Sequence, residues 1–152
     1  MLNALLTLGM LTLSGNGPAS WSFQARIAEG SAVQVELMAT LKEGWHVYAT
    51  ELPSDLGPLP TVFRFSDSPH YKATGPVQEP LPVEVYDENF AMVVRHHSGT
   101  PVFTLPVERL TDDPFTVDGE LEYMVCNDKT CLPPEVVKFR IEVPAAVSNV
   151  KE

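Results

Sequence analysis

The sequence contains little cysteine, little positive charge and no long apolar run. Its 152 residues include only two cysteines, Cys126 and Cys131, and 10 Lys and Arg against 20 Asp and Glu. Two cysteines and four scattered histidines form no recognisable zinc site, because zinc takes about four ligands in a tetrahedral array. The formal net charge of −10 repels phosphate backbones, and no local Lys/Arg cluster reverses it. We therefore expect no nucleic-acid partner and no metal or other cofactor.

The apolar stretch at residues 1–13 is shorter than the about 20 residues that a membrane span needs. Small residues and a turn follow it up to Ala19, a pattern typical of an export signal, although no Lys or Arg precedes the run. We expect residues 1–20 to be an export signal or an N-terminal extension, and a buried first helix or strand is the alternative. Export would place the protein in the periplasm or a similar oxidising compartment, where a disulfide persists.

A helical pattern is also missing. After Leu13 no stretch keeps a 3.6-residue apolar stripe for three turns, and 14 prolines are spread through the chain. Apolar and polar residues instead alternate with a period of two, which predicts strands over residues 21–27, 32–41, 61–65, 90–96, 101–107, 119–125 and 137–143. Pro106 suggests that its strand lies at a sheet edge or contains a bulge. We therefore predict an all-β sandwich or barrel over residues 21–144, with a flexible tail at residues 145–152.

The two cysteines are five residues apart, so a disulfide between them would close a very small ring. Such a ring restrains the unfolded chain by only about 2 kcal/mol, against about 4 kcal/mol for a long loop, and is better suited to opening and closing. The spacing is not the Cys-x-x-Cys of a thioredoxin-type centre, and no His or Met follows Cys131 as in blue-copper sites. A structural and a redox-active disulfide both remain possible, and the usage of disulfides in secreted domains favours the structural one.

Three further groups of residues are candidates for a site. Residues 85–90 form a polar turn with two acids and an aromatic tip, Phe90, which in an ordinary loop would pack into the core. In residues 44–48 the Tyr48 hydroxyl is expected at the surface. His96 and His97 are neighbours on a predicted strand and point to opposite faces, which predicts one packed and one exposed histidine and no metal site.

Taken together and in this order, these segments resemble the N-terminal periplasmic domain of the DsbD thiol:disulfide interchange proteins, the disulfide bond corrector family. The resemblance covers about residues 21–143. It depends on Trp-His-Val-Tyr at 45–48, Gly-Pro-Leu-Pro-Thr at 57–61, Tyr-Asp-Glu-Asn-Phe at 86–90, and the segment 123–135 with both cysteines and its Pro-Pro-Glu end. The cysteine segment is the most specific of these pieces.

The resemblance implies an immunoglobulin-like β-sandwich whose cysteine pair passes electrons from a membrane-embedded donor to oxidised thioredoxin-like proteins, such as disulfide isomerases and cytochrome-maturation factors. It implies that Cys131 forms the mixed disulfide with a partner and that Cys126 resolves it. Phe90 then matches an aromatic cap over the cysteines, and Asp87 and Glu88 match its acidic positions. Tyr48, Tyr123 and Pro133 are expected to support the site.

The chain has no membrane-spanning electron source of its own after the sandwich, so the resemblance implies a separate donor or a larger parent protein. We expect a monomer that acts as a protein-disulfide reductase. A non-enzymatic immunoglobulin-like binding module with an inert disulfide is the main alternative. A weaker one is an exported metal chaperone that uses both cysteines, Met124 and a histidine.

Overall fold

The alternating segments fold as strands. The computed structural model describes residues 17–147, and in this range it contains eleven β-strands and no helix. The strands are β1 (Ala19–Ile27), β2 (Ala32–Leu41), β3 (His46–Tyr48), β4 (Val62–Phe65), β5 (Tyr71–Ala73), β6 (Val83–Asp87), β7 (Met92–His97), β8 (Val102–Arg109), β9 (Phe115–Tyr123), β10 (Val125–Cys126) and β11 (Glu135–Val143). Consistent with this, no helix among the described residues is long and apolar enough to span a membrane.

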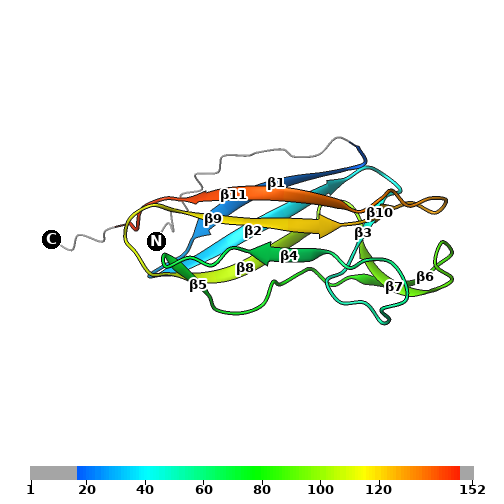
Figure 1. Ribbon diagram of the computed structural model, residues 1–152, viewed down its shortest axis with the longest axis horizontal. Coiled ribbons are helices and arrows are strands. Elements are labelled where there is room, and N and C mark those ends of the chain that lie inside the picture. The colour runs from blue at the N-terminus through cyan, green and yellow to red at the C-terminus, as the bar shows by residue number, and fades with distance from the viewer. Residues whose placement is uncertain (1–16, 148–152) are drawn as a thin grey trace, which may run out of the picture.

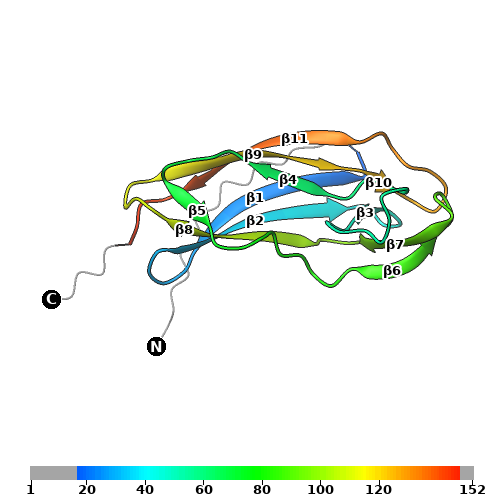
Figure 2. The same cartoon turned by 60° about the horizontal axis from the view of Figure 1, so that its bottom comes forward.

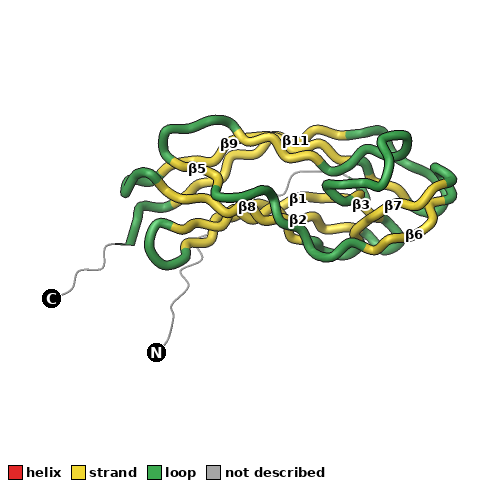
Figure 3. The backbone as a smooth tube through the Cα atoms, turned by 90° about the horizontal axis from the view of Figure 1, so that it is seen from below, coloured by secondary structure: helices red, strands yellow, loops and turns green. Residues whose placement is uncertain are grey.

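The strands form three antiparallel sheets. One has the order β1-β2-β8-β5, the second β11-β9-β4 and the third β10-β3-β7-β6. The first two sheets face each other as the two layers of a sandwich, as Figures 2 and 3 show. The third sheet extends the sandwich at one end, to the right in Figure 1, and β10 connects it to β9. Cys126 lies on this end sheet, in β10, and residues 88–91 connect two of its strands, β6 and β7.

The main core lies between the two layers and is strongly aromatic. Trp21 is fully buried, and its ring lies 6.1 Å from Phe63, 5.8 Å from Phe103 and 5.5 Å from Tyr123, measured between centroids. Each such buried aromatic stabilises the fold by about 1.5–3 kcal/mol. On β11 the buried residues alternate with exposed ones along the whole strand, which confirms the clearest period-two segment of the sequence.

The predicted strands all exist, with ends that match or are shifted by up to four residues. The short strands β3, β5 and β6 were missed, and β10 was not distinguished from β9. The edge position expected for Pro106 is wrong, because β8 lies between β2 and β5. The Thr74 amide donates to the Pro106 carbonyl, so the carbonyl and the nitrogen of Pro106 both face the β5 side of the strand. β5 ends at Ala73, one residue before Thr74, so Pro106 lies beyond its last paired residue. The strand is internal, yet no neighbouring strand needs the missing N–H.

The ends of the chain are described only in part. Most of the expected leader, residues 1–16, lies outside the described residues, as do residues 148–152. Ala19 is already buried in β1 and is paired with Leu41, two residues before the expected start of the domain. In the tail, the Ala146 amide donates to the Asp112 carbonyl at 2.9 Å.

Candidate functional site

The two cysteines close a tight hairpin at the end of the sandwich. Cys126 and Cys131 form a disulfide, and their Cα atoms lie 4.1 Å apart. Independently of the sulfurs, the Asn127 amide donates to the Thr130 carbonyl at 2.9 Å, and the Leu132 amide donates to the Val125 carbonyl at 3.0 Å. Hydrogen bonds therefore fix this cysteine hairpin, residues 125–132, without the covalent bond. The disulfide can open without removing the contacts that shape the hairpin.

The two sulfur-bearing residues differ in exposure. Cys126 is fully buried, whereas Cys131 is half-buried. An incoming thiolate attacks one sulfur of a disulfide along the axis of the S–S bond, so the accessibility of each sulfur decides which one reacts. The geometry favours attack at Cys131, with Cys126 as the leaving group.

Phe90 shares an apolar cluster with this disulfide. It packs against a small apolar cluster of Tyr48, Val94, Met124 and Cys126, which Cys131 also joins. The Phe90 ring meets the Tyr48 ring edge-on at 6.2 Å between centroids. This cluster is separate from the main core of the sandwich. Phe90 thus packs against a core cluster, as the ordinary-loop alternative expected, but this cluster contains Cys126, and the cap role stays a prediction.

Asp87 holds the loop that carries Phe90. This loop, residues 88–91 between β6 and β7, is called the cap loop below. One carboxylate oxygen of Asp87 accepts from the Asn89 amide at 2.8 Å and the Phe90 amide at 3.3 Å, and the other accepts from the Tyr48 hydroxyl at 2.6 Å. Ala91 closes the turn at φ 52°, a conformation that costs a non-glycine residue about 1–2 kcal/mol. The two hydrogen bonds that Asp87 accepts from the loop amides hold the loop against this strain.

The Tyr48 hydroxyl is therefore inside the site, and the expectation that it reaches the surface is wrong: Tyr48 is fully buried. Burial and the hydrogen bond to Asp87 raise the pKa of this phenol well above its ordinary value. The hydroxyl stays protonated and donates to the carboxylate at any physiological pH. The sequence could not predict this burial, because the carboxylate that accepts the hydroxyl's hydrogen bond, Asp87, is distant from Tyr48 in the sequence.

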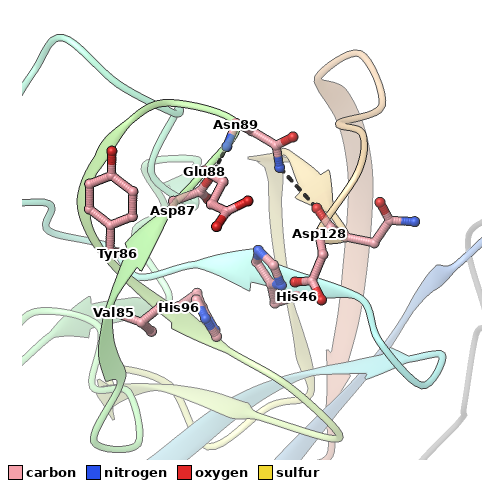
Figure 4. Close-up of a pocket in the computed structure, with 9 residues that line it drawn as sticks. His46, Val85, Tyr86, Asp87, Glu88, Asn89, His96 and Asp128 are labelled. Atoms are coloured by element: carbon pink, nitrogen blue, oxygen red, sulfur yellow. Dashed lines mark hydrogen bonds between the residues drawn. The ribbon is translucent and has the colours of Figure 1, made fainter.

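Two histidines lie under the acidic residues of this end (Figure 4). The rings of His46 and His96 stack at 4.1 Å between centroids. His46 is the cross-strand partner of Cys126, and His96 that of Tyr48. Burial lowers the pKa of His46, although Asp87 and Asp128 act in the opposite direction. Burial, and next the proximity of His46, lower the pKa of His96 to about 4. Both imidazoles are therefore neutral near pH 7.

The adjacent histidine takes part in a different network. His97 lies on the opposite face from His96 and is buried, with its Nε2 2.9 Å from Glu79. Glu79 also accepts from the Thr50 amide and hydroxyl. Burial alone would raise the pKa of Glu79, but the hydrogen bonds from His97 and Thr50 outweigh it and hold the pKa below its ordinary value. The prediction of opposite faces is correct, but His96 is half-buried rather than exposed.

The remaining predicted residues lie around the site at different depths. Glu88 is exposed at the tip of the cap loop, and Pro133 is exposed after the hairpin. Tyr123 is buried in the main core rather than beside the sulfurs, and its hydroxyl donates to Glu135 at 2.7 Å at the start of β11. Burial and this hydrogen bond raise the pKa of the Tyr123 phenol. Tyr123 therefore joins the end of β9 to the start of β11, and its support of the cysteine site stays a prediction.

Sequence reasoning missed the contact between the cap loop and the hairpin. The Asn89 side chain donates to the Asn127 carbonyl at 2.9 Å, and the Asn127 side chain caps its own turn by accepting from the Lys129 and Thr130 amides. Asparagine two or three residues before such amides is a signal for a turn of this kind. No signal in the sequence indicated that His46 and His96 stack. Among residues 17–147, no three His, Cys, Asp or Glu side chains are grouped to hold a metal ion.

Fold and site together define a β-sandwich protein whose disulfide is partly accessible at Cys131 and shares an apolar cluster with Phe90. The family model described as "Thiol:disulfide interchange protein DsbD, N-terminal" matches residues 17–142. The chain therefore belongs to this family, whose chemistry is thiol:disulfide interchange, and its fold is the immunoglobulin-like sandwich.

Solved structures agree on the fold. The DsbD N-terminal domain of Neisseria meningitidis in the reduced form is 17% identical, with a TM-score of 0.52, and the match covers 81% of this chain and 86% of that one. The N-terminal periplasmic domain of ScsB from Proteus mirabilis is 16% identical, with a TM-score of 0.58 over 93% of this chain and 54% of that one. This chain thus spans about half of that ScsB domain. A comparison with curated protein sequences finds no significant match.

Proposed function

We propose that this domain is a monomeric, exported dithiol carrier. It receives two electrons from a membrane-embedded reductant and passes them to oxidised thioredoxin-like proteins, including disulfide isomerases. The observation that carries the proposal is the Cys126–Cys131 disulfide, which has one half-buried cysteine and shares an apolar cluster with Phe90, in a chain of the DsbD N-terminal family. The periplasmic origin of the ScsB domain supports the location outside the cytoplasm.

The reducing half-reaction uses both cysteines in turn. The Cys131 thiolate attacks one sulfur of the partner's disulfide, and the partner's other sulfur leaves as a thiolate that takes up a proton. Cys126 then gives up its proton and attacks the Cys131 sulfur. The partner leaves as a dithiol and the domain keeps the disulfide, so two electrons have moved. The half-accessible position of Cys131 and the buried position of Cys126 support this division of roles.

The cap loop gives the exchange its selectivity in this proposal. Phe90 excludes small thiols and oxidants from the sulfurs, while the nearby carboxylates of Asp87 and Glu88 disfavour a thiolate at Cys131 and keep the reduced pair unreactive. A docking partner displaces the loop and thereby starts the exchange. The Asn89–Asn127 hydrogen bond joins the loop to the hairpin at a single point, which supports a loop that can move.

The decisive experiment is a redox titration of the purified domain followed by trapping. We expect a reduction potential above about −300 mV, the level below which structural disulfides resist biological reductants. Cys131→Ser should abolish reduction of an oxidised thioredoxin-like protein, and Cys126→Ser should accumulate the mixed disulfide with it.

The same titration distinguishes an inert binding module. A potential well below about −300 mV, or a Cys131→Ser variant that still reduces its partner, would contradict the carrier function. The serine variants remove only the small disulfide ring, worth about 2 kcal/mol of stability, so they are expected to remain folded.

A further inference from the structure

We propose that the pocket beside the cysteine hairpin binds a lysine or arginine side chain of the partner and so selects disulfides that have a basic neighbour. The pocket is lined by residues of β3, β6, β7, the cap loop and the hairpin, and it is called the acidic pocket below. Its lining is His46, Val85, Tyr86, Asp87, Glu88, Asn89, His96, Asn127 and Asp128. This inference rests on the proposed carrier function, because it names a feature of the substrates that such a carrier prefers.

The charged groups of the acidic pocket are all negative. Asp87, Glu88 and Asp128 supply three carboxylates, and the pocket lining contains no Lys or Arg. Lys129 follows Asp128 and is exposed, but it does not line the pocket. Asp87 is already saturated by Tyr48 and the cap-loop amides, whereas Glu88 and Asp128 are exposed. These two carboxylates are the ones free to meet a cation.

The base of the pocket contains two buried ring nitrogens that have no hydrogen-bond partner among the described residues. His46 is only 8% exposed, and its Nε2 has no hydrogen-bond partner. The Nδ1 of His96, on the ring stacked against it, is likewise buried and unpaired. A buried polar nitrogen without a partner costs about 1–3 kcal/mol, so the site gains when a donor arrives. Figure 4 shows both rings below the carboxylates of Asp87 and Glu88.

The chemistry of the lining matches a basic side chain. Ammonium and guanidinium groups only donate hydrogen bonds, and the pocket offers carboxylate oxygens and, on each neutral imidazole, one nitrogen that can accept. With the pKa values of both histidines lowered, chiefly by burial, the imidazoles remain neutral near pH 7 and leave the pocket's negative charge uncompensated. The cavity is about 320 Å³, at the lower limit for small-ligand sites, which suits one side chain rather than a cofactor.

The position of the pocket connects it to the reaction. Asn127 and Asp128 are part of the turn between the two cysteines, and Asn89 of the cap loop donates to Asn127. A cation held between Glu88 and Asp128 would therefore contact the cap loop and the hairpin at once. A partner whose basic residue flanks its disulfide would be oriented at Cys131 before exchange begins.

Small disulfides of different charge test this directly. The domain is first reduced, and its oxidation is then followed with cationic cystamine, neutral hydroxyethyl disulfide and anionic dithiodipropionate. In each case the two domain thiols are oxidised and the small disulfide is reduced to two thiols. We expect cystamine to react fastest and dithiodipropionate slowest at equal concentration. The Glu88→Gln and Asp128→Asn changes should each lower the cystamine-to-neutral rate ratio about two- to fivefold, the range of single exposed ion pairs.

A matched control separates the pocket from the general field of the acidic protein. Asp112 and Asp113 are exposed in the loop between β8 and β9, at the opposite end of the sandwich in Figure 1. The pocket double variant combines Glu88→Gln with Asp128→Asn. Asp112→Asn with Asp113→Asn removes the same two negative charges and should leave the ratio unchanged. An equal fall in this control, or an unchanged ratio in the pocket double variant, would overturn the inference. Because the proposed cap slows small disulfides, the same rates are also measured in the Phe90→Ala variant. If that reduced variant fails to react even with the neutral disulfide, the carrier function itself fails instead.

His46→Phe provides an independent readout. The phenyl ring can keep the stack on His96 but offers no nitrogen acceptor, so the cystamine rate should fall while the rate with the neutral disulfide stays within about twofold. An equal change in both rates would assign His46 a structural role only and contradict its part in the pocket.

Discussion

The body of the sandwich and its end sheet are stabilised in different ways. Between the two large sheets, Trp21, Phe103 and their aromatic neighbours bury apolar surface with hardly any polar group among them. In the end sheet, the small apolar cluster is surrounded by directed hydrogen bonds from Asp87, Asn89 and Asn127. Apolar burial is lost only when the layers separate, whereas a few hydrogen bonds can be exchanged locally. The body can stay folded while the end sheet rearranges around its sulfurs.

Two phenylalanine truncations should separate the regions most strongly. Phe103 is fully buried in the body, so Phe103→Ala should lower the free energy of unfolding by about 3–5 kcal/mol, measured by denaturant titration. Phe90→Ala, at the half-buried cap, should cost much less stability but speed reduction of the disulfide by dithiothreitol roughly tenfold, which corresponds to about 1.4 kcal/mol of loop opening. Unchanged dithiothreitol kinetics in Phe90→Ala would remove the cap role.

Removing one tyrosine hydroxyl from each region compares how much a single hydrogen bond contributes to stability there. Tyr48→Phe leaves one oxygen of the buried Asp87 carboxylate without a donor and should cost about 1–3 kcal/mol while also loosening the cap loop. Tyr123→Phe removes a bond to the exposed Glu135 and should cost only about 0.5–1.5 kcal/mol, with no change in dithiothreitol rate. Denaturant titration and dithiothreitol kinetics on both variants check this. Equal effects of the two changes would show that Asp87 does not fix the loop.

Acid should weaken the end sheet before the body. The pKa of His96 is lowered to about 4, chiefly by burial, so the unfolded chain binds a proton that the folded chain does not. Stability from this group is fully present above about pH 6.5 and is lost as the pH falls toward 4, by up to about 2 kcal/mol at pH 5. Unfolding titrations near pH 7.5 and near pH 5 measure this difference, which should shrink in His96→Asn. His70→Asn, at an exposed histidine, serves as the control. A pH dependence unaltered in His96→Asn would mean that burial of this ring is not responsible.

The sequence predicted the body better than the end sheet. Long strands such as β2 and β11 alternate over nine or ten residues, and their pattern follows from the one face that each buries. The strands β3, β5 and β6 are three to five residues long, too short for a period to appear. Their pairing depends on neighbouring strands rather than on their own residues. The edge position predicted from Pro106 failed for the same reason. The length of β5, which the sequence did not show, decides whether a neighbouring strand needs the N–H that proline lacks.

In the site, too, the features formed by neighbouring residues were predictable and those formed by distant residues were not. The cysteine pair and the Asp-Glu-Asn-Phe segment were identifiable because each is contiguous, and the local spacing of Asp87, Asn89 and Phe90 already specifies a turn. The burial of Tyr48 and the stacking of His46 on His96 were not identifiable. Both depend on strands β3, β6 and β7 lying side by side.

By itself, then, the order of residues determined an all-β chain, a small sulfur ring and a turn with an aromatic tip, because alternation, ring size and turn chemistry act over a few neighbouring positions. Only the tertiary structure decided that the aromatic tip packs in one cluster with the cysteines, that one of the two cysteines is partly exposed, and that two neutral imidazoles and three carboxylates line one pocket. Burial and proton affinity are properties of surroundings, and here those surroundings come from strands far apart in the chain.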